Sequence, residues 1–331
     1  MATIKVGING FGRIGRRVFR LLLEHPDIEV IAINDVADSK TLSHLLKYDS
    51  IHGVLQKEVC SSPKSISVAG TSYRFSSETD ISNISWKGVD IVIEATGKFK
   101  TKSFLEQHIN SGAKKAILCA PPIDDSVKTV VLGVNDHILS PDDTMVSNAS
   151  CTTNNAAPML QLIHEAFEIE QAYITTVHSY TSDQSLHDQP HKDLRRARAA
   201  GQSIVPTTTG AAKALTKIFP ELNNAIGGCG IRVPVANGSL CDITLNVKKE
   251  VSIASVNQVF KKAANSSMKG ILEYTQDPIV SVDILGNPHS CIFDSEMTSV
   301  IGKMIKIIGW YDNETGYCSR IIDLILKISS K

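Results

Sequence analysis

The feature that most constrains the fold of this chain is a glycine-rich turn between a predicted strand and a predicted helix. Residues 10–15 read G-F-G-R-I-G, directly after residues 4–8, which alternate and are rich in β-branched side chains. Helically grouped apolar residues follow over 16–24, and residues 28–33 form an almost unbroken apolar run of the kind found in buried parallel strands. A strand, turn, helix and strand in this order predict a βαβ unit.

The surroundings of the glycine turn are those that a dinucleotide site requires. Glycines permit a tight turn and close approach of the backbone to a pyrophosphate, which the N-terminus of the following helix attracts. Asp35 lies 20 residues beyond Gly15, at the end of the second strand. A carboxylate there accepts hydrogen bonds from ribose hydroxyls and repels a 2′-phosphate. The pattern favours NAD binding, with NAD preferred to NADP, over a βαβ unit with a purely structural role.

Further strand-like runs predict a doubly wound parallel sheet of the Rossmann type in the first domain. The runs are residues 89–94, 114–119 and 129–132, and a polar helical segment lies at 101–110. Segments 95–97 and 120–122 follow two of these runs. Their residues are explained equally well by contacts with a cofactor and by ordinary turns in loops.

From about residue 150 the pattern changes to that of an α+β domain with a mostly antiparallel sheet. Its longer strands are predicted at 240–247 and 304–311, and its helices at 210–219 and 256–264. The last helix, 317–329, is apolar enough to require packing, and we expect it to return to the first domain. The predicted domains are therefore 1–149 with 315–331, and 150–314.

Cys151 is the candidate nucleophile. Small polar residues surround it, and an apolar run with helical spacing follows at 156–163. A helix N-terminus favours negative charge, so the sequence predicts a lowered thiol pKa. His178, at the end of the predicted strand 173–178, is a candidate base. A buried structural cysteine, a histidine without catalytic role, and His164 as the base remain alternatives.

Two segments further along the chain are candidate anion sites. Residues 207–213, TTTGAAK, form a threonine-rich turn that opens a helix and offers N–H and hydroxyl donors. Arg232 is a charge embedded in an apolar strand and suits phosphate or carboxylate. A helix cap and a buried ion pair are the structural alternatives.

Charge and cysteine usage exclude several classes of function. The formal net charge is zero, which argues against nucleic acid as the main partner. The seven cysteines are scattered without C-x-x-C spacing, so neither a metal site nor a disulfide framework is predicted. With no signal-like leader and no apolar run of membrane-spanning length, we expect a cytoplasmic protein without a membrane segment.

Taken together, these motifs resemble the phosphorylating glyceraldehyde-3-phosphate dehydrogenase family over essentially the whole chain. The resemblance is carried by residues 9–15, 45–50, 147–154, 175–178, 193–199, 208–213, 231–234 and 310–314. It implies NAD-dependent oxidative phosphorylation of D-glyceraldehyde 3-phosphate to 1,3-bisphosphoglycerate, with Cys151 as the nucleophile that forms a thioester and His178 as the base. It further implies a role in glycolysis or gluconeogenesis and a homotetramer, with the charged loop from Ser179 to Pro206 as a subunit contact.

The resemblance also assigns ligand contacts residue by residue. The residues assigned to NAD are Gly10, Gly12, Arg13, Ile14, Asp35, Thr96, Cys119 and Asn313. Those assigned to the substrate's own phosphate are Thr181 and Arg232, and those assigned to the attacking phosphate are Ser150, Thr152, Arg196, Thr209 and Gly210.

The chain departs from the family pattern at four positions. Asn155 replaces a second cysteine, Cys119 a serine, Thr79 a basic residue beside the adenine, and Thr315 an aromatic residue. The nearest alternative function is erythrose-4-phosphate dehydrogenase, which the Thr-Gly-Ala-Ala-Lys turn disfavours. A non-catalytic RNA- or protein-binding role is the alternative from a different class.

Overall fold

A computed structural model describes residues 3–329 and divides the chain into two compact units. The first unit contains the residues up to Val130, Ile138–Ala149 and the residues from Cys318 onward. The second contains Val131–His137 and Ser150–Tyr317.

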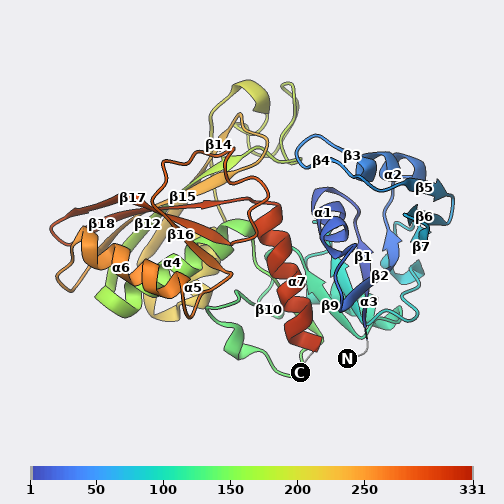
Figure 1. Cartoon of the computed structure of the whole chain (residues 1–331), viewed down its shortest axis with the longest axis horizontal. Helices are drawn as coiled ribbons and strands as arrows, with labels where there is room; N and C mark the ends of the chain where they lie inside the picture. Colours follow the sequence, from blue (N-terminus) through green and yellow to red (C-terminus); the bar gives the residue numbers. More distant parts are fainter. Residues whose placement is uncertain (1–2, 330–331) are drawn as a thin grey trace. The chain divides into compact units, whose positions relative to one another are not determined.

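The first unit is built on a nine-stranded sheet in the order β10-β11-β9-β8-β1-β2-β7-β6-β5 (Figure 1). Its strands are β1 (Ile4–Asn9), β2 (Ile28–Asn34), β5 (Val59–Ser62), β6 (Ser65–Val68), β7 (Thr71–Ser76), β8 (Ile91–Glu94), β9 (Lys115–Leu118), β10 (Lys128–Thr129) and β11 (Met145–Ser147). The accompanying helices are α1 (Arg13–Leu22), α2 (Ser39–Lys47) and α3 (Lys102–Asn110), and β3 (Tyr48–Asp49) pairs with β4 (Gly53–Val54). Pairing is parallel from β10 to β7, which confirms the predicted doubly wound sheet.

Two local predictions for this unit differ from the structure. Helix α1 begins at Arg13, three residues earlier than predicted, because the chain turns into the helix directly after Gly12. The strand predicted at 129–132 ends at Thr129. After it, Val131 N donates to the side chain of Asn135 and the chain turns. The apolar residues 130–132, which would suit a strand, are therefore buried in a turn.

The second unit is built on a seven-stranded sheet in the order β13-β14-β12-β15-β18-β17-β16. Its strands are β12 (Ile169–Ser179), β13 (Val205–Thr207), β14 (Ile226–Val233), β15 (Ser239–Val247), β16 (Leu272–Thr275), β17 (Cys291–Ile301) and β18 (Met304–Tyr311). Four of its six pairings are antiparallel, as predicted. Helices α4 (Cys151–Phe167), α5 (Ala211–Ile218) and α6 (Ile253–Ala264) gather on one face of this sheet (Figure 1).

The last helix, α7 (Thr315–Ser329), begins in the second unit and continues in the first. The buried carboxylate of Asp312 accepts hydrogen bonds from the N–H groups of Glu314 and Thr315, so it caps the start of this helix. Within the first unit, Lys115 Nζ donates to Ile328 O at 2.9 Å.

Candidate active site

The glycine turn has the geometry of a phosphate cradle. Gly10 has φ +90°, and a Cβ there would lie 2.6 Å from Thr96 N. A Cβ at Gly15 would lie 2.1 Å from Gly10 O, so this glycine lets α1 pack against the turn. At Gly12 nothing lies within 4 Å of an added Cβ, which leaves open space at the positive end of α1.

A cavity of about 290 Å³ adjoins this turn at the carboxyl ends of the parallel strands, where doubly wound sheets bind ligands. It is lined by Asn9, Gly10, Gly12, Asn34, Asp35, Val36, Glu78, Thr79, Ile81, Ile84, Ala95, Thr96, Lys98 and Phe99. The carboxylate of Asp35 accepts from Phe11 N at 2.6 Å and from Ala37 N at 3.0 Å, which fixes its position beside the cavity. The donor turn, the open space at Gly12 and the fixed carboxylate fit a dinucleotide with a free ribose 2′-hydroxyl.

The side chain of Arg13 forms an ion pair within the protein. Its Nη1 lies 2.7 Å from Asp49 Oδ2, in an ion pair whose carboxylate is largely buried. Burial alone would raise the pKa of Asp49, but hydrogen bonds from Arg13, His52 and Ile51 outweigh it and hold the pKa well below its usual range. Arg13 and the following Ile14 are therefore available to a pyrophosphate through their backbone, in the first turn of α1.

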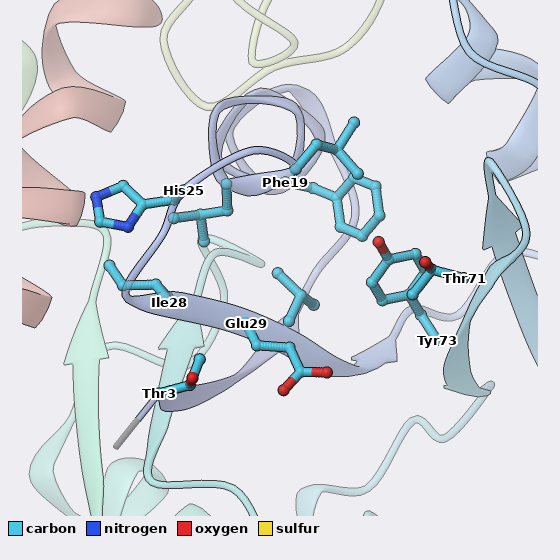
Figure 2. Close-up of a pocket in the computed structure, with 10 residues that line it drawn as sticks. Thr3, Phe19, His25, Ile28, Glu29, Thr71 and Tyr73 are labelled. Atoms are coloured by element: carbon cyan, nitrogen blue, oxygen red, sulfur yellow. The ribbon is translucent and has the colours of Figure 1, made fainter. Parts of the chain in front are cut away.

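A second cavity, of about 330 Å³, lies at the opposite ends of the strands (Figure 2). It is lined by Thr3, by Ile28 and Glu29 at the start of β2, by Thr71 and Tyr73 of β7, and by apolar residues of α1. The figure shows the ring of Tyr73 beside that of Phe19, which it meets edge to face, with the Glu29 carboxylate below them. None of the residues that the sequence singles out lines this cavity, and amino-terminal strand ends are not where such sheets bind nucleotides.

In the second unit, Cys151 and His178 meet as predicted. Cys151 is the first residue of α4, and Ser150 caps the helix by accepting from Thr153 N at 3.1 Å. His178 is buried on β12, with Nε2 3.5 Å from Cys151 Sγ. Its Nδ1 lies 2.7 Å from Ser179 O, an acceptor, and 2.5 Å from Arg232 Nη1, a donor. The tautomer with its proton on Nδ1 donates to Ser179 O and leaves the Nε2 lone pair facing the sulfur, whereas the contact with Arg232 Nη1 uses the other tautomer.

The predicted lowering of the thiol pKa is wrong. Burial raises the pKa of Cys151 above its ordinary value, although the charge of Arg232 and hydrogen bonds from Thr152 act in the opposite direction. Burial, with the charge of Arg232, lowers the pKa of His178 to about 3. The imidazole is therefore neutral near neutral pH. At the thiol, desolvation has a larger effect on the pKa than the positive end of the helix.

Two guanidinium groups act on this site. Arg232 lies opposite His178 in the parallel pairing of β14 with β12, and its Nη1 donates to Ser179 O at 3.0 Å. Arg196 is held by Asp183, at 2.6 Å, and by Thr207 Oγ1, at 2.9 Å. The two arginines are close enough for their charges to interact, as a site for phosphate groups requires.

The remaining residues assigned to phosphate belong to the same unit. Thr209 Oγ1 accepts from Ala211 N at 3.2 Å, at the start of α5. Gly210 precedes that helix and has open space around an added Cβ. Thr152 Oγ1 is already hydrogen-bonded to Tyr311 OH at 3.0 Å, and Thr181 lies in the loop after β12.

Asn313 has a fixed amide orientation. Its Oδ1 accepts from Ser179 Oγ and Ser239 Oγ, each at 2.9 Å, and from Gly238 N at 3.2 Å. Three donors on the oxygen leave Nδ2 as the group that can donate to a ligand, which fits recognition of a carboxamide oxygen.

Sequence reasoning missed a buried network beneath the nucleophile. Tyr311 OH is hydrogen-bonded to both Thr152 Oγ1, at 3.0 Å, and Thr176 Oγ1, at 2.8 Å, and its ring meets that of His178 edge to face at 5.9 Å. The available signal was a tyrosine at the end of an apolar strand, and a threonine two residues before His178, hence on the same strand face.

The part of the chain that the structure describes contains no disulfide, no cluster of metal ligands and no membrane-spanning helix. All seven cysteines are free thiols. Residues 3–329 contain no group of three or more side chains that could hold a metal ion. No helix in this range is long and apolar enough to cross a membrane.

Comparisons with known proteins match both units. A family model described as the NAD binding domain of glyceraldehyde 3-phosphate dehydrogenase matches residues 4–102, and one described as its C-terminal domain matches residues 150–313. The first match includes the glycine turn and Asp35; the second includes Cys151, His178 and Asn313. The first description confirms NAD as the predicted cofactor.

Full-length relatives give the same result. Glyceraldehyde-3-phosphate dehydrogenase of Geobacillus stearothermophilus is 50% identical over 333 residues, covering 99% of each chain. Glyceraldehyde-3-phosphate dehydrogenase 2 of Streptomyces avermitilis is 51% identical over 334 residues, again 99% of each. Glyceraldehyde-3-phosphate dehydrogenase of Borreliella burgdorferi is 50% identical over 335 residues, covering 98% of this chain and 99% of its own.

Proposed function

The chain belongs to the glyceraldehyde-3-phosphate dehydrogenase family, and from this premise we propose which residues carry out its NAD-dependent oxidative phosphorylation of D-glyceraldehyde 3-phosphate. The observation that carries the proposal is the contact of Cys151 Sγ with His178 Nε2, at 3.5 Å, at the start of α4. The sulfur attacks the aldehyde carbon to form a hemithioacetal, and Nε2 transfers the thiol proton to the resulting oxyanion.

The second half of the reaction uses the same pair. Bound NAD supplies the acceptor for the hydride that leaves the hemithioacetal carbon. His178 takes the hydroxyl proton in that step, and a thioester remains on Cys151. Inorganic phosphate then attacks the thioester carbon, the carbon–sulfur bond breaks, the sulfur takes back the proton held by His178, and 1,3-bisphosphoglycerate is released. The thioester conserves the free energy of aldehyde oxidation, which hydrolysis would dissipate.

We propose that two anion subsites serve the two phosphate groups. Arg232 and Thr181 bind the phosphate of the aldehyde; Arg196 binds the attacking phosphate, together with Ser150, Thr152, Thr209 and Gly210. The interaction between the two guanidinium charges and the open space at Gly210 support this division. Because Thr152 Oγ1 also contacts Tyr311, its contribution requires a hydroxyl that donates to one group and accepts from the other.

For the cofactor, we propose that Asp35 binds the adenosine ribose, that Gly10, Gly12, Arg13 and Ile14 bind the pyrophosphate through backbone groups, and that Asn313 Nδ2 binds the carboxamide. The hydroxyl of Thr96 both donates to Glu94 and accepts from Lys98 N. Thr96 therefore contributes through backbone or methyl contacts. Cys119 contributes at the end of β9. We also propose that the enzyme works as a homotetramer in the cytoplasm, where its seven free thiols stay reduced.

An assay of NADH formation tests this function. We expect D-glyceraldehyde 3-phosphate to be oxidised in a reaction that requires inorganic phosphate, erythrose 4-phosphate to be a poor substrate, and Cys151→Ala to abolish turnover. His178→Asn should lower kcat by roughly 10²- to 10⁴-fold. Turnover independent of phosphate, or full activity in Cys151→Ala, would overturn the assignment.

A further inference from the structure

A buried carboxylate that takes no part in the proposed chemistry lies at the carboxyl end of β8. Glu94 is 1% exposed. Its Oε2 accepts from Asn9 Nδ2 at 2.6 Å and contacts His108 Nε2 at 2.9 Å. Its Oε1 accepts from Thr96 N at 2.9 Å and also from the Thr96 hydroxyl. All four sites on the carboxyl group therefore face potential donors.

The hydrogen bonds of His108 determine the charge of this cluster. Trp86 Nε1 lies 2.9 Å from His108 Nδ1, and an indole nitrogen can only donate. Nδ1 is therefore without a proton, so the ring is neutral and its Nε2–H donates to Glu94. Three of its four partners, Asn9 Nδ2, Thr96 N and His108 Nε2–H, can only donate, and hydrogen bonds from such groups favour the carboxylate form. In the part of the chain that the structure describes, no lysine or arginine pairs with it.

In the proposed NAD site, the strand order puts this charge on the nicotinamide side of β1. β8 and β2 lie on either side of β1, and β9 follows β8 in the sheet. Asp35 at the end of β2 marks the adenosine side and the glycine turn after β1 marks the pyrophosphate, so the other half of the dinucleotide extends over β8 and β9. There Cys119 N donates to Glu94 O at 2.9 Å. After burial, the charge of Glu94 is the second cause that raises the pKa of the Cys119 thiol.

We propose that Glu94 sets the relative affinity of the enzyme for oxidised and reduced cofactor, a role that rests on the proposed NAD site. The oxidised nicotinamide ring is cationic and the reduced ring is neutral, whereas the pyrophosphate and ribose groups are common to both forms. A buried anion without a cationic partner attracts the oxidised ring alone, because its effect on the shared groups cancels in the ratio of the two dissociation constants. Glu94 is thus a specificity-determining residue for the redox state.

The test is calorimetric titration of the full-length protein with NAD⁺ and with NADH. In Glu94→Gln we expect the ratio Kd(NADH)/Kd(NAD⁺) to fall by roughly three- to tenfold, because the oxidised ring loses its attraction to one buried charge. His108→Gln is the matched control. Its amide can accept from Trp86 and donate to Glu94, so the carboxylate charge remains and the ratio should stay at the wild-type value.

A second variant keeps the proposal testable if Glu94→Gln, whose amide would face other donors, does not fold. His108→Lys leaves Glu94 in place and sets an ammonium against it, so the ratio should fall there too while it stays unchanged in His108→Gln. Equal changes in both dissociation constants in either folded variant would overturn the proposal and leave Glu94 a structural role. If the wild-type protein bound neither NAD⁺ nor NADH, the proposed NAD site itself would be wrong.

Discussion

At the residue scale, the charge of Arg232 acts on both members of the catalytic pair. It lowers the pKa of Cys151, in opposition to burial, and it lowers the pKa of His178, in the same direction as burial. In Arg232→Ala both pKa values should therefore rise. The rise at the thiol decides reactivity, because less thiolate is present at any given pH, so the pH profile of Cys151 alkylation by iodoacetamide should move to higher pH.

Turnover provides a second measurement of the same variant. Loss of a charged contact with substrate phosphate should lower kcat/KM by roughly 10- to 100-fold. Arg232→Lys keeps the charge without the planar fork, so its alkylation profile should stay nearer the wild type while kcat/KM falls. An unchanged alkylation profile in Arg232→Ala would show that this charge does not reach the sulfur.

Asp35 offers a charge test of cofactor choice. Its carboxylate also accepts from Phe11 N and Ala37 N, so replacement by alanine would disturb the glycine turn as well as the ribose site. Asp35→Asn removes the charge and keeps one oxygen acceptor. We expect the ratio of kcat/KM for NADP to that for NAD to rise about tenfold, because repulsion of the 2′-phosphate is relieved. Steady-state kinetics with both cofactors would contradict this if the ratio stayed constant.

The sequence predicts the positions of reactive residues better than their electrostatics. Cys151 could be placed at the start of a helix, and His178 at the end of a strand, because both depend on short local patterns. The sign of the thiol pKa shift could not, because it depends on burial by the folded chain and on the charge of Arg232, which lies 81 residues further along the sequence. The effect of Asn155, which replaces a cysteine of the family pattern, likewise cannot be predicted until the groups that its side chain contacts are known.

At the element scale, the side chain of Asn155 joins α4 to the adjacent sheet by hydrogen bonds. Its Nδ2 lies within 3.2–3.3 Å of the carbonyl oxygens of Ser290, Gly309 and Trp310, all from other segments of the second unit. Asn155→Cys replaces this amide with a weak donor, so we expect the free energy of unfolding to fall by about 1–3 kcal/mol. Denaturant unfolding followed by circular dichroism would measure the change.

Asn265 provides the matched control for that variant. Its Nδ2 makes one exposed hydrogen bond, to Lys261 O at 2.8 Å, so Asn265→Cys should change stability by no more than about 0.5 kcal/mol. Equal losses in the two variants would mean that the buried contacts of Asn155 contribute nothing beyond those of a surface amide.

Elements themselves were predictable where the apolar pattern was long and uninterrupted. β1, β2, β15 and β18 coincide with predicted runs to within a residue or two. The short strands β5, β6 and β7 were missed because β5 is mostly exposed and the alternation in β6 and β7 is short, with only two buried apolar residues in each strand. Their register depends on pairing with β2 and with each other, which no local window contains.

At the scale of the whole molecule, the segment between β12 and β13 is the strongest sign of assembly. It is long, contains neither an α-helix nor a strand, and carries Leu186, Leu194 and Ile204 at 76, 82 and 70% exposure. Large apolar side chains so exposed on one segment are typical of a contact surface. We therefore expect light scattering of the wild-type protein at micromolar concentration to give the mass of four chains.

Substitution within this segment then separates an interface from an ordinary surface loop. Leu194→Asp introduces a charge that would have to be buried in a subunit contact, so it should shift the protein towards smaller species and lower its thermal stability. Ile123→Asp, at a side chain 71% exposed in the first unit, is the control and should leave the mass unchanged. A wild-type monomer, or a tetramer that tolerates Leu194→Asp without loss of mass or stability, would show that this segment does not hold the subunits together.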